Sequence, residues 1–197
     1  LAIKHQDLGQ LRQYLNHLQD RKEILNTETE KYGLIGHIAC TIGNLDIINI
    51  LEENGCDLSL ITSEGTTALE EACYGDNADL NPRDRLTLIT KLIEINGINI
   101  TNVALHNSLY CSDLSMLEFL LNKGTDPNVL CSAGFTPLLV LINQPRVSNK
   151  DLKAIKLLLD KGANILINDK YVGNSLHLAA ERGHLNVVQL LLDYATQ

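Results

Sequence analysis

A leucine that opens an apolar helical stripe recurs along the chain, and this recurrence constrains the fold more than any other feature. The successive leucines lie 37, 41, 28, 38 and 33 residues apart, scattered around a unit of ~33 residues with insertions and one deletion. Four of the five later stripes end in glycine, the residue that most easily adopts the left-handed conformation at a helix end. The chain is therefore predicted to be a row of similar helical units, opened by Leu8, Leu45, Leu86, Leu114, Leu152 and Leu185.

A second helix, built from small residues, precedes each stripe. In the last unit Ala179 and Ala180 lie before Gly183, and Leu185 follows. Small side chains allow the first helix to lie close to its neighbours, and glycine permits a tight turn. Because one unit cannot bury its own stripe, the units must stack on one another. The small residues at the place equivalent to Ala179 are Ala39, Ala72 and Ser108.

The residues that begin these units resemble the ankyrin repeat. The resemblance rests on Gly134-x-Thr136-Pro137-Leu138, on LLLDKGANI at 157–165 and on LHLAAERGHLNVVQLLL at 176–192. Thr136 can cap a helix, and Pro137 suits a first turn. The resemblance implies an all-α ankyrin-repeat solenoid of stacked helix-turn-helix units with short β-turn fingers. Tetratricopeptide arrays have a similar period of ~34 residues but lack the Thr-Pro-Leu start and the fingers.

We expect one ankyrin-repeat domain over residues 1–197, as part of a longer chain, because the sequence begins at Leu1 inside a helical pattern. Leu105 lies only eight positions after Gly97, whereas Leu176 lies 14 positions after Gly162, so the fourth repeat should lack most of its finger. Two insertions that contain Pro and Asn, at 75–85 and 143–151, should form loops. The expected repeats are 1–28, 29–61, 62–97, 98–130, 131–168 and 169–197.

Charge and composition argue against several classes of function. The net charge is −8 and the pI about 5.2, so a nucleic acid backbone would be repelled. No apolar run reaches the ~18 residues that span a bilayer, so no membrane partner is expected. The five cysteines form no CxxC pair, and reduced thiols inside a cell are the simplest interpretation. We expect a cytoplasmic protein, delivered into a host cell if its source is an intracellular bacterium.

The sequence predicts no enzyme, cofactor, metal site or small-molecule substrate. It contains no phosphate-binding loop, dinucleotide-binding glycine motif, HExxH or Gly-x-Ser-x-Gly. His37, His106 and His177 occupy one equivalent position, and the resemblance implies that each bonds a loop of its own or the adjacent repeat. A dyad of Cys111 and His106 would need an orienting group and an oxyanion site, and the sequence indicates neither. A hydrolase using Cys111 or Cys131 is the weakest of the three functional hypotheses.

The resemblance implies that a partner protein binds the concave face, formed by finger tips and by exposed positions of the first helices. Phe135 and Tyr171 are the candidate aromatic anchors, although Phe135 could instead pack on the neighbouring finger. Lys150, Lys153 and Lys156 could form a docking patch, but the interleaved Asp151 favours a solvated face. The candidate binding residues are Glu30, Lys31, Thr41, Ser63, Glu64, Thr66, Tyr74, Tyr110, Ser132, Phe135, Asn143, Lys170, Tyr171, Glu181 and Arg182.

The leading hypothesis is a monomeric, non-catalytic scaffold for protein–protein interaction. Its acidic balance predicts basic groups on the partner surface. The alternative is a recognition domain of a larger multidomain protein, such as a secreted bacterial effector enzyme or a ubiquitin-ligase adaptor.

Overall fold

The chain folds into two compact helical units, residues 1–112 and 113–197. The structure is a computed structural model that describes residues 7–74, 82–96, 100–111 and 114–196. Within these ranges the regular secondary structure is helical, and β-type pairing is confined to isolated bridges. The predicted all-α fold is confirmed. None of the helices within these ranges has the length and apolar character that a membrane span requires.

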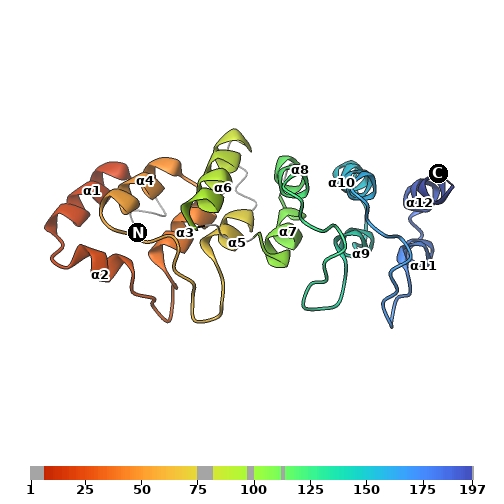
Figure 1. Ribbon diagram of the computed structural model, residues 1–197, viewed down its shortest axis with the longest axis horizontal. Coiled ribbons are helices and arrows are strands. Elements are labelled where there is room, and N and C mark those ends of the chain that lie inside the picture. The colour runs from red at the N-terminus through yellow and green to blue at the C-terminus, as the bar shows by residue number, and fades with distance from the viewer. Residues whose placement is uncertain (1–6, 75–81, 97–99, 112–113, 197) are drawn as a thin grey trace. The chain divides into compact units, whose positions relative to one another are not determined.

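Unit 1 arranges its helices in two layers. The first helices α3, α5 and α7 lie side by side, with α5 packed between the other two (Figure 1). The second helix α4 packs on α3 and on α1, while α6 packs on α5. The helices of unit 1 are α1 Leu8–His17, α2 Arg21–Leu25, α3 Ile35–Ile42, α4 Leu45–Glu53, α5 Ala68–Cys73, α6 Pro82–Asn96 and α7 Asn102–Ser108.

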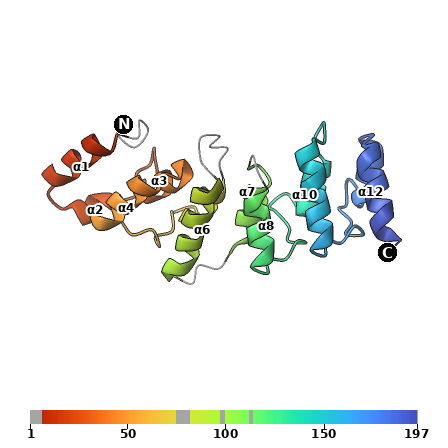
Figure 2. The same ribbon diagram turned by 90° about the horizontal axis from the view of Figure 1, so that it is seen from above.

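Unit 2 repeats the arrangement with fewer helices. The first helices α9 and α11 pack on each other, and each also packs on the second helix that follows it, α10 or α12 (Figures 1 and 2). The second helices α10 and α12 are also in contact. The helices of unit 2 are α8 Ser115–Asn122, α9 Pro137–Ile142, α10 Asn149–Asp160, α11 Ser175–Glu181 and α12 Leu185–Ala195.

Small residues in α3, α5, α7 and α11 and aliphatic residues in the second helices divide the packing as the sequence predicts, whereas the first helix α9 buries large residues such as Leu141 and Ile142. Ala39, Ala72, Ser108 and Ala179 are all buried. Gly43 and Gly183 make the turn to the second helix with φ of +76° and +71°, which an L side chain adopts only with strain. The second helices contribute the large core side chains, among them Ile47, Ile48, Leu51, Leu120, Ile155 and Leu158.

Side-chain caps fix where the first helices begin. The Thr136 hydroxyl accepts a hydrogen bond from the Leu139 N–H at 3.2 Å, and Pro137 occupies the first turn of α9 as predicted. In α5 the cap is reciprocal. The Thr67 hydroxyl accepts from the Glu70 N–H, and the Glu70 carboxylate accepts from the Thr67 N–H. These caps place the preceding finger at a fixed angle to the helix.

Four fingers share one backbone geometry. Each is a five-residue loop, 29–33, 62–66, 131–135 or 169–173, whose first N–H donates to the fifth carbonyl at 3.0–3.1 Å. A glycine with positive φ stands at the fourth place in two fingers (Gly65, Gly134) and at the fifth place in the others (Gly33, Gly173). The side chains between the two ends of each loop take no part in this closing bond.

An asparagine ties consecutive repeats together in the same way in both units. The Asn26 amide donates to the Gly55 carbonyl at 2.8 Å and accepts from the Asp57 N–H at 2.7 Å. In unit 2, Asn128 donates to the Gly162 carbonyl at 3.1 Å and accepts from the Asn164 N–H at 2.7 Å. Asn26 ends α2, a five-residue helix that the sequence did not predict because it is too short for an apolar stripe.

The loop prediction for the first insertion is wrong at its end. Helix α6 begins at Pro82, so residues 82–85 are helical, while 75–81 lie outside the described residues. Proline needs no hydrogen-bond partner in a first turn, and Asp84 there complements the helix dipole. In the second insertion 143–148 is a loop, but α10 begins at Asn149, where Ser148 and Asp151 form a reciprocal cap.

The shortened fourth repeat is matched by a changed residue in the repeat before it. In the second repeat the His37 Nε2 donates to the Leu60 carbonyl, which leads into the next finger, at 2.9 Å. Glu70 holds the equivalent place in the third repeat, three residues after the N-cap, and accepts a hydrogen bond from the Thr101 hydroxyl at 2.5 Å. Thr101 is the N-cap of α7, and residues 97–99 before it lie outside the described residues.

Candidate functional site

We define the finger face of each unit as its finger tips together with the exposed positions of its first helices and of the turns that follow them. Eleven of the 15 residues predicted for partner binding are exposed there, and four are half-buried. The exposed residues are Glu30, Lys31, Ser63, Glu64, Tyr74, Tyr110, Ser132, Lys170, Tyr171, Glu181 and Arg182. The half-buried residues are Thr41, Thr66, Phe135 and Asn143.

The tip of the 169–173 finger presents Tyr171 most fully. The Asp169 carboxylate accepts hydrogen bonds from the backbone N–H groups of Tyr171 at 2.8 Å and Val172 at 3.1 Å. These bonds hold the turn while the Tyr171 side chain remains 81% exposed. The Lys170 ammonium lies 4.6 Å from the centre of the tyrosine ring. Tyr171 is thus a large, solvent-exposed side chain on a loop that hydrogen bonds hold in place.

Phe135 and Thr66 occupy the fifth place of their fingers and therefore lie at the base of the loop. The Phe135 carbonyl accepts the closing bond from the Cys131 N–H at 3.0 Å, and Thr66 accepts the equivalent bond from Thr62. Phe135 is half-buried. Its position is less suited to an interface anchor than the tip position of Tyr171.

Thr41 and Asn143 link neighbouring first helices. The Thr41 hydroxyl lies 3.0 Å from both the His37 carbonyl and Oε2 of Glu71, so it joins α3 to α5. Arg182 donates from Nη2 to Oδ1 of Asn143 at 2.5 Å, which joins the ends of α11 and α9. These two positions contribute to the stacking of the repeats as well as to the surface.

The sequence analysis missed Tyr32, which is exposed at the tip of the 29–33 finger. The Lys31 ammonium lies 5.0 Å from the centre of its ring. The signal was the position of glycine. Glycine is the fifth residue of the 29–33 and 169–173 fingers, at Gly33 and Gly173. In the other two fingers glycine is the fourth residue. Moving the glycine to the fifth place leaves a further tip position open for a side chain.

Tyrosine is found on the surface of this protein and not in its core. Five of the six tyrosines, Tyr14, Tyr32, Tyr74, Tyr110 and Tyr171, are more than half exposed, and Tyr194 is half-buried. All but Tyr14 and Tyr194 belong to a finger face. Large amphipathic rings held in solvent are typical of residues that dominate binding energy.

A hydrogen bond between fingers limits their movement in unit 1. The Glu28 carboxylate accepts from the backbone N–H of Ser63 at 2.8 Å and from its hydroxyl at 3.2 Å. The segment that leads into the 29–33 finger is therefore joined to the second residue of the 62–66 finger. A surface fixed in this way loses less conformational entropy when it binds.

The histidines have the structural role that the resemblance implies wherever a bond can be described. His37 bonds the segment before the next finger, as described above, and the His177 Nδ1 lies 2.7 Å from Oδ1 of Asn174, the cap of its own helix. His106 is buried in α7. Within the described ranges, no three His, Cys, Asp or Glu side chains are grouped in a way that could hold a metal ion.

The cysteines behave as small buried groups. The Cys111 Sγ donates to the Cys73 carbonyl at 3.4 Å, and both residues are fully buried. Burial raises the pKa of the Cys40 and Cys73 thiols well above the ordinary value, and burial followed by the charge of Glu52 raises the pKa of Cys56 to about 11. Such thiols stay protonated near pH 7 and are poor nucleophiles.

In the native protein we expect iodoacetamide to label one cysteine, Cys131, much faster than the other four. Cys131 is half-buried at the start of a finger, whereas Cys40, Cys56, Cys73 and Cys111 are buried. Intact-mass measurements over time should show a single adduct in buffer and five adducts in urea. Rapid labelling of Cys73 or Cys111 in buffer would contradict the described packing of α5 and α7.

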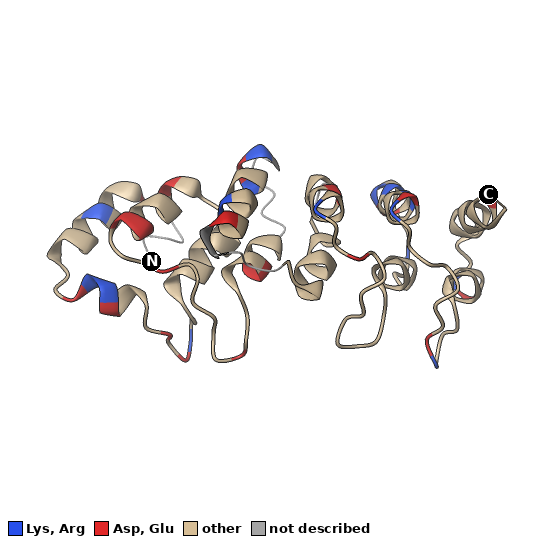
Figure 3. Cartoon of the chain, viewed as in Figure 1, with Lys and Arg blue, Asp and Glu red and all other residues tan. Residues whose placement is uncertain are grey.

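Helix α10 carries mixed charge. Lys153 and Lys156 are exposed, and Asp160, one turn further on, accepts a hydrogen bond from the Tyr194 hydroxyl. Figure 3 shows basic and acidic segments together on this helix. This mixture favours a solvated face over a basic docking patch.

Comparison with known proteins identifies the type of repeat. The family model described as ankyrin repeats (three copies) matches residues 105–197. The ankyrin repeat domain of Bcl-3 superposes with a TM-score of 0.72 at 21% identity, over 98% of this chain and 83% of that one. This superposition shows that the residues before 105, which the family model does not match, have the same fold.

Two curated relatives show how the matched region is placed in longer proteins. Ankyrin repeat and SOCS box protein 16 of Mus musculus is 30% identical over 107 residues, covering 52% of this chain and 24% of the relative. The Oryza sativa protein named "Probable E3 ubiquitin-protein ligase XBOS32" is 27% identical over 197 residues, covering 89% of this chain and 35% of the relative. The chain thus spans well under half the length of each.

Proposed function

We propose that this chain, which is an ankyrin repeat protein, binds another protein through its finger faces. Ankyrin repeats are in general protein–protein interaction domains and are generally non-catalytic. The proposal adds which surface of this chain is used. It further holds that the chain acts as a monomer in the cytoplasm, where its free thiols stay reduced.

The placement of the tyrosines carries the proposal. The chain contains six tyrosines, two phenylalanines and no tryptophan, yet none of the tyrosines fills the core. Four tyrosines stand exposed on the finger faces, where they serve no packing role within a repeat. Exposing such side chains leaves apolar area in water that a partner would cover, so a bound protein gains hydrophobic free energy there.

The rigidity of the fingers supports the same proposal. Every finger is closed by the same backbone hydrogen bond, and the first two are joined through Glu28 and Ser63. Loops fixed before binding pay a smaller entropic cost when a partner docks. The tips can therefore vary in sequence while their position stays constant.

Site-specific photo-crosslinking tests the proposal. A benzophenone-bearing residue replaces Tyr171 in one variant, Tyr74 in a second and, as a control, Tyr14 on α1, which is exposed but lies off the finger faces. In extracts of cells that express the protein, we expect the first or second variant to crosslink a partner and the control not to. Tyr→Ala at the crosslinking position should weaken retention of that partner about tenfold or more, the range of an interface hot spot. Equal crosslinking from Tyr14 would move the site off the finger faces.

A second candidate is a recognition domain within a ubiquitin ligase. The names of the two relatives, one with a SOCS box and one an E3 ubiquitin-protein ligase, favour it, because the matched region fills only 24% and 35% of those proteins. On this view the finger faces select the substrate and another part of a longer polypeptide acts on it. A ubiquitylation assay on the protein purified from its natural source, with E1 and E2 enzymes, tests this. If the protein binds a partner but no ubiquitin is transferred to that partner, the ligase role is rejected and the scaffold role is kept.

A further inference from the structure

The net charge of the chain lies entirely within unit 1. Residues 1–112 carry 16 acidic and eight basic side chains, a net charge of −8, whereas residues 113–197 carry eight of each. A charged partner is therefore steered by the field of unit 1, and unit 2 adds little. The question is where on unit 1 the exposed acidic groups lie.

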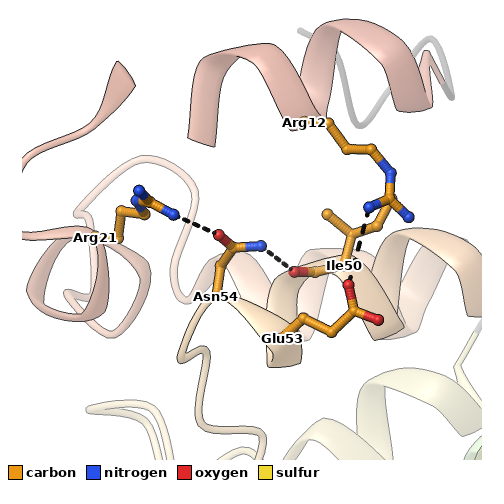
Figure 4. A network of polar contacts seen from close by, with 5 residues as sticks. All are labelled: Arg12, Arg21, Ile50, Glu53 and Asn54. Atoms are coloured by element: carbon orange, nitrogen blue, oxygen red, sulfur yellow. Dashed lines mark hydrogen bonds and ion pairs between the residues drawn. The ribbon is translucent and has the colours of Figure 1, made fainter. Parts of the chain in front are cut away.

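Two basic side chains of unit 1 form ion pairs with carboxylates of α4. Arg12 of α1 lies 3.9 Å from the Glu53 carboxylate, and Lys91 of α6 forms an ion pair with Glu52. Figure 4 shows Arg12 and Arg21 directed at the same end of α4. Arg12 and Lys91 therefore pair with carboxylates at the end of α4, on the second-helix layer.

Acidic groups predominate on the finger face of unit 1. Glu30 and Glu64 are exposed at two finger tips, and Glu71 of α5 is half-buried beside Thr41. Figure 3 shows acidic colour on both fingers and on α5. In the described fingers and first helices of this unit, Lys31 is the one lysine or arginine, and it already lies over the Tyr32 ring.

Exposed tyrosines follow the first helices that carry these carboxylates. Tyr74 is the C-cap of α5 and lies three residues after Glu71. Tyr110 follows α7, which packs on α5. The Asn107 side chain of α7 donates a hydrogen bond to the Glu70 carbonyl of α5 at 3.1 Å. Val103 on α7 is also exposed. An aromatic ring with an adjacent carboxylate attracts ammonium and guanidinium groups, and arginine also stacks on such rings.

We infer that the finger face of unit 1 binds a segment of the partner protein that carries several arginine or lysine residues. This rests on the proposed function and adds the unit and the chemistry of the partner. The basic groups stack on Tyr74 and Tyr110 and pair with the carboxylates of Glu64 and Glu71. The contact of Lys31 with Tyr32, 5.0 Å from ammonium to ring centre, is an example of this pairing within the chain.

The charge requirement is tested with the whole chain and a short fluorescein-labelled peptide of alternating Arg and Ser, followed by fluorescence anisotropy. We expect the peptide to bind, the matching Glu–Ser peptide not to bind, and affinity to fall as salt rises. Removing three finger-face carboxylates should weaken binding about tenfold. The matched control removes three exposed carboxylates of the same unit and should change affinity by less than about twofold. The test variant is Glu30→Gln/Glu64→Gln/Glu71→Gln, and the control is Glu23→Gln/Asp46→Asn/Glu53→Gln.

The aromatic requirement has its own matched control. Tyr74→Ala with Tyr110→Ala should weaken peptide binding about tenfold, whereas the two Tyr→Phe changes keep the rings and should keep the affinity. Tyr14→Ala removes a somewhat more exposed ring on α1 and should leave affinity unchanged. If both carboxylate triples weaken binding equally, or if Tyr14→Ala acts like the test pair, the attraction is a non-specific property of an acidic protein and the inference is overturned.

The crosslinking experiment separates this inference from the proposed function. Crosslinks from Tyr74 to a partner segment rich in Arg or Lys support both. Crosslinks from a finger face to a segment without basic residues leave the proposed function standing and overturn the inference. Crosslinks only from outside the finger faces overturn the proposed function, and the inference with it.

Discussion

Leu191→Ala is expected to lower the free energy of unfolding by about 2–5 kcal/mol. Leu191 lies on α12 with 1% of its surface exposed, so its removal takes apolar area out of the core and leaves a cavity against α11. The measurement is urea unfolding followed by circular dichroism at the helix band, with wild type and variant compared under the same conditions.

The control is Leu185→Ala on the same helix. Leu185 is 77% exposed, so the same chemical change should shift the free energy of unfolding by less than about 0.5 kcal/mol. Helix propensity favours alanine equally in both variants, which isolates the effect of burial. Equal losses in the two variants would mean that a structure beyond the described packing covers Leu185.

Glu70→Ala is expected to lower the free energy of unfolding by about 1–3 kcal/mol. The Glu70 carboxylate is buried and accepts from the Thr67 N–H at 2.9 Å and from the Thr101 hydroxyl at 2.5 Å. Alanine removes the acceptor for both donors, so the cap of α5 and its link to the start of α7 are lost together. Thermal unfolding by differential scanning calorimetry measures the change.

Two comparisons show whether the loss comes from these hydrogen bonds. Glu70→Gln keeps one acceptor oxygen and should be less damaging than Glu70→Ala. Glu64→Ala removes an exposed glutamate from a finger tip and should change stability by less than about 0.5 kcal/mol. A Glu70→Ala variant as stable as Glu64→Ala would show that the contact with Thr101 contributes nothing.

The layered fold was predictable because its signals are local and repeated. Glycine turns, small residues such as Ala39 and Ala179, and the Thr136-Pro137 start each act within one repeat, and each copy supports the others. Helix α2 and the start of α6 at Pro82 were not predicted because neither follows the apolar period. Their positions depend on contacts such as that of Asn26 with Gly55, which no single stretch of sequence displays.

The candidate surface was predictable in outline but not in detail. Counting positions from the helix starts placed Tyr171, Tyr74 and Tyr110 on the exposed surface. The same counting did not distinguish the tip of a finger from its base, where Phe135 lies half-buried, and it omitted Tyr32. The separation of charge between the two units is visible only once the boundary near residue 112 is known.

The common closing bond of the fingers has a consequence for how this protein can change. Since the first and fifth residues fix the loop through their backbones, the residues between them other than Gly65 and Gly134 can be exchanged without disturbing the stack of helices. The positions that set binding preference are thus separate from those that set the fold. Evolution, or an experimenter, can change two or three codons per finger and obtain a new preference on the same scaffold.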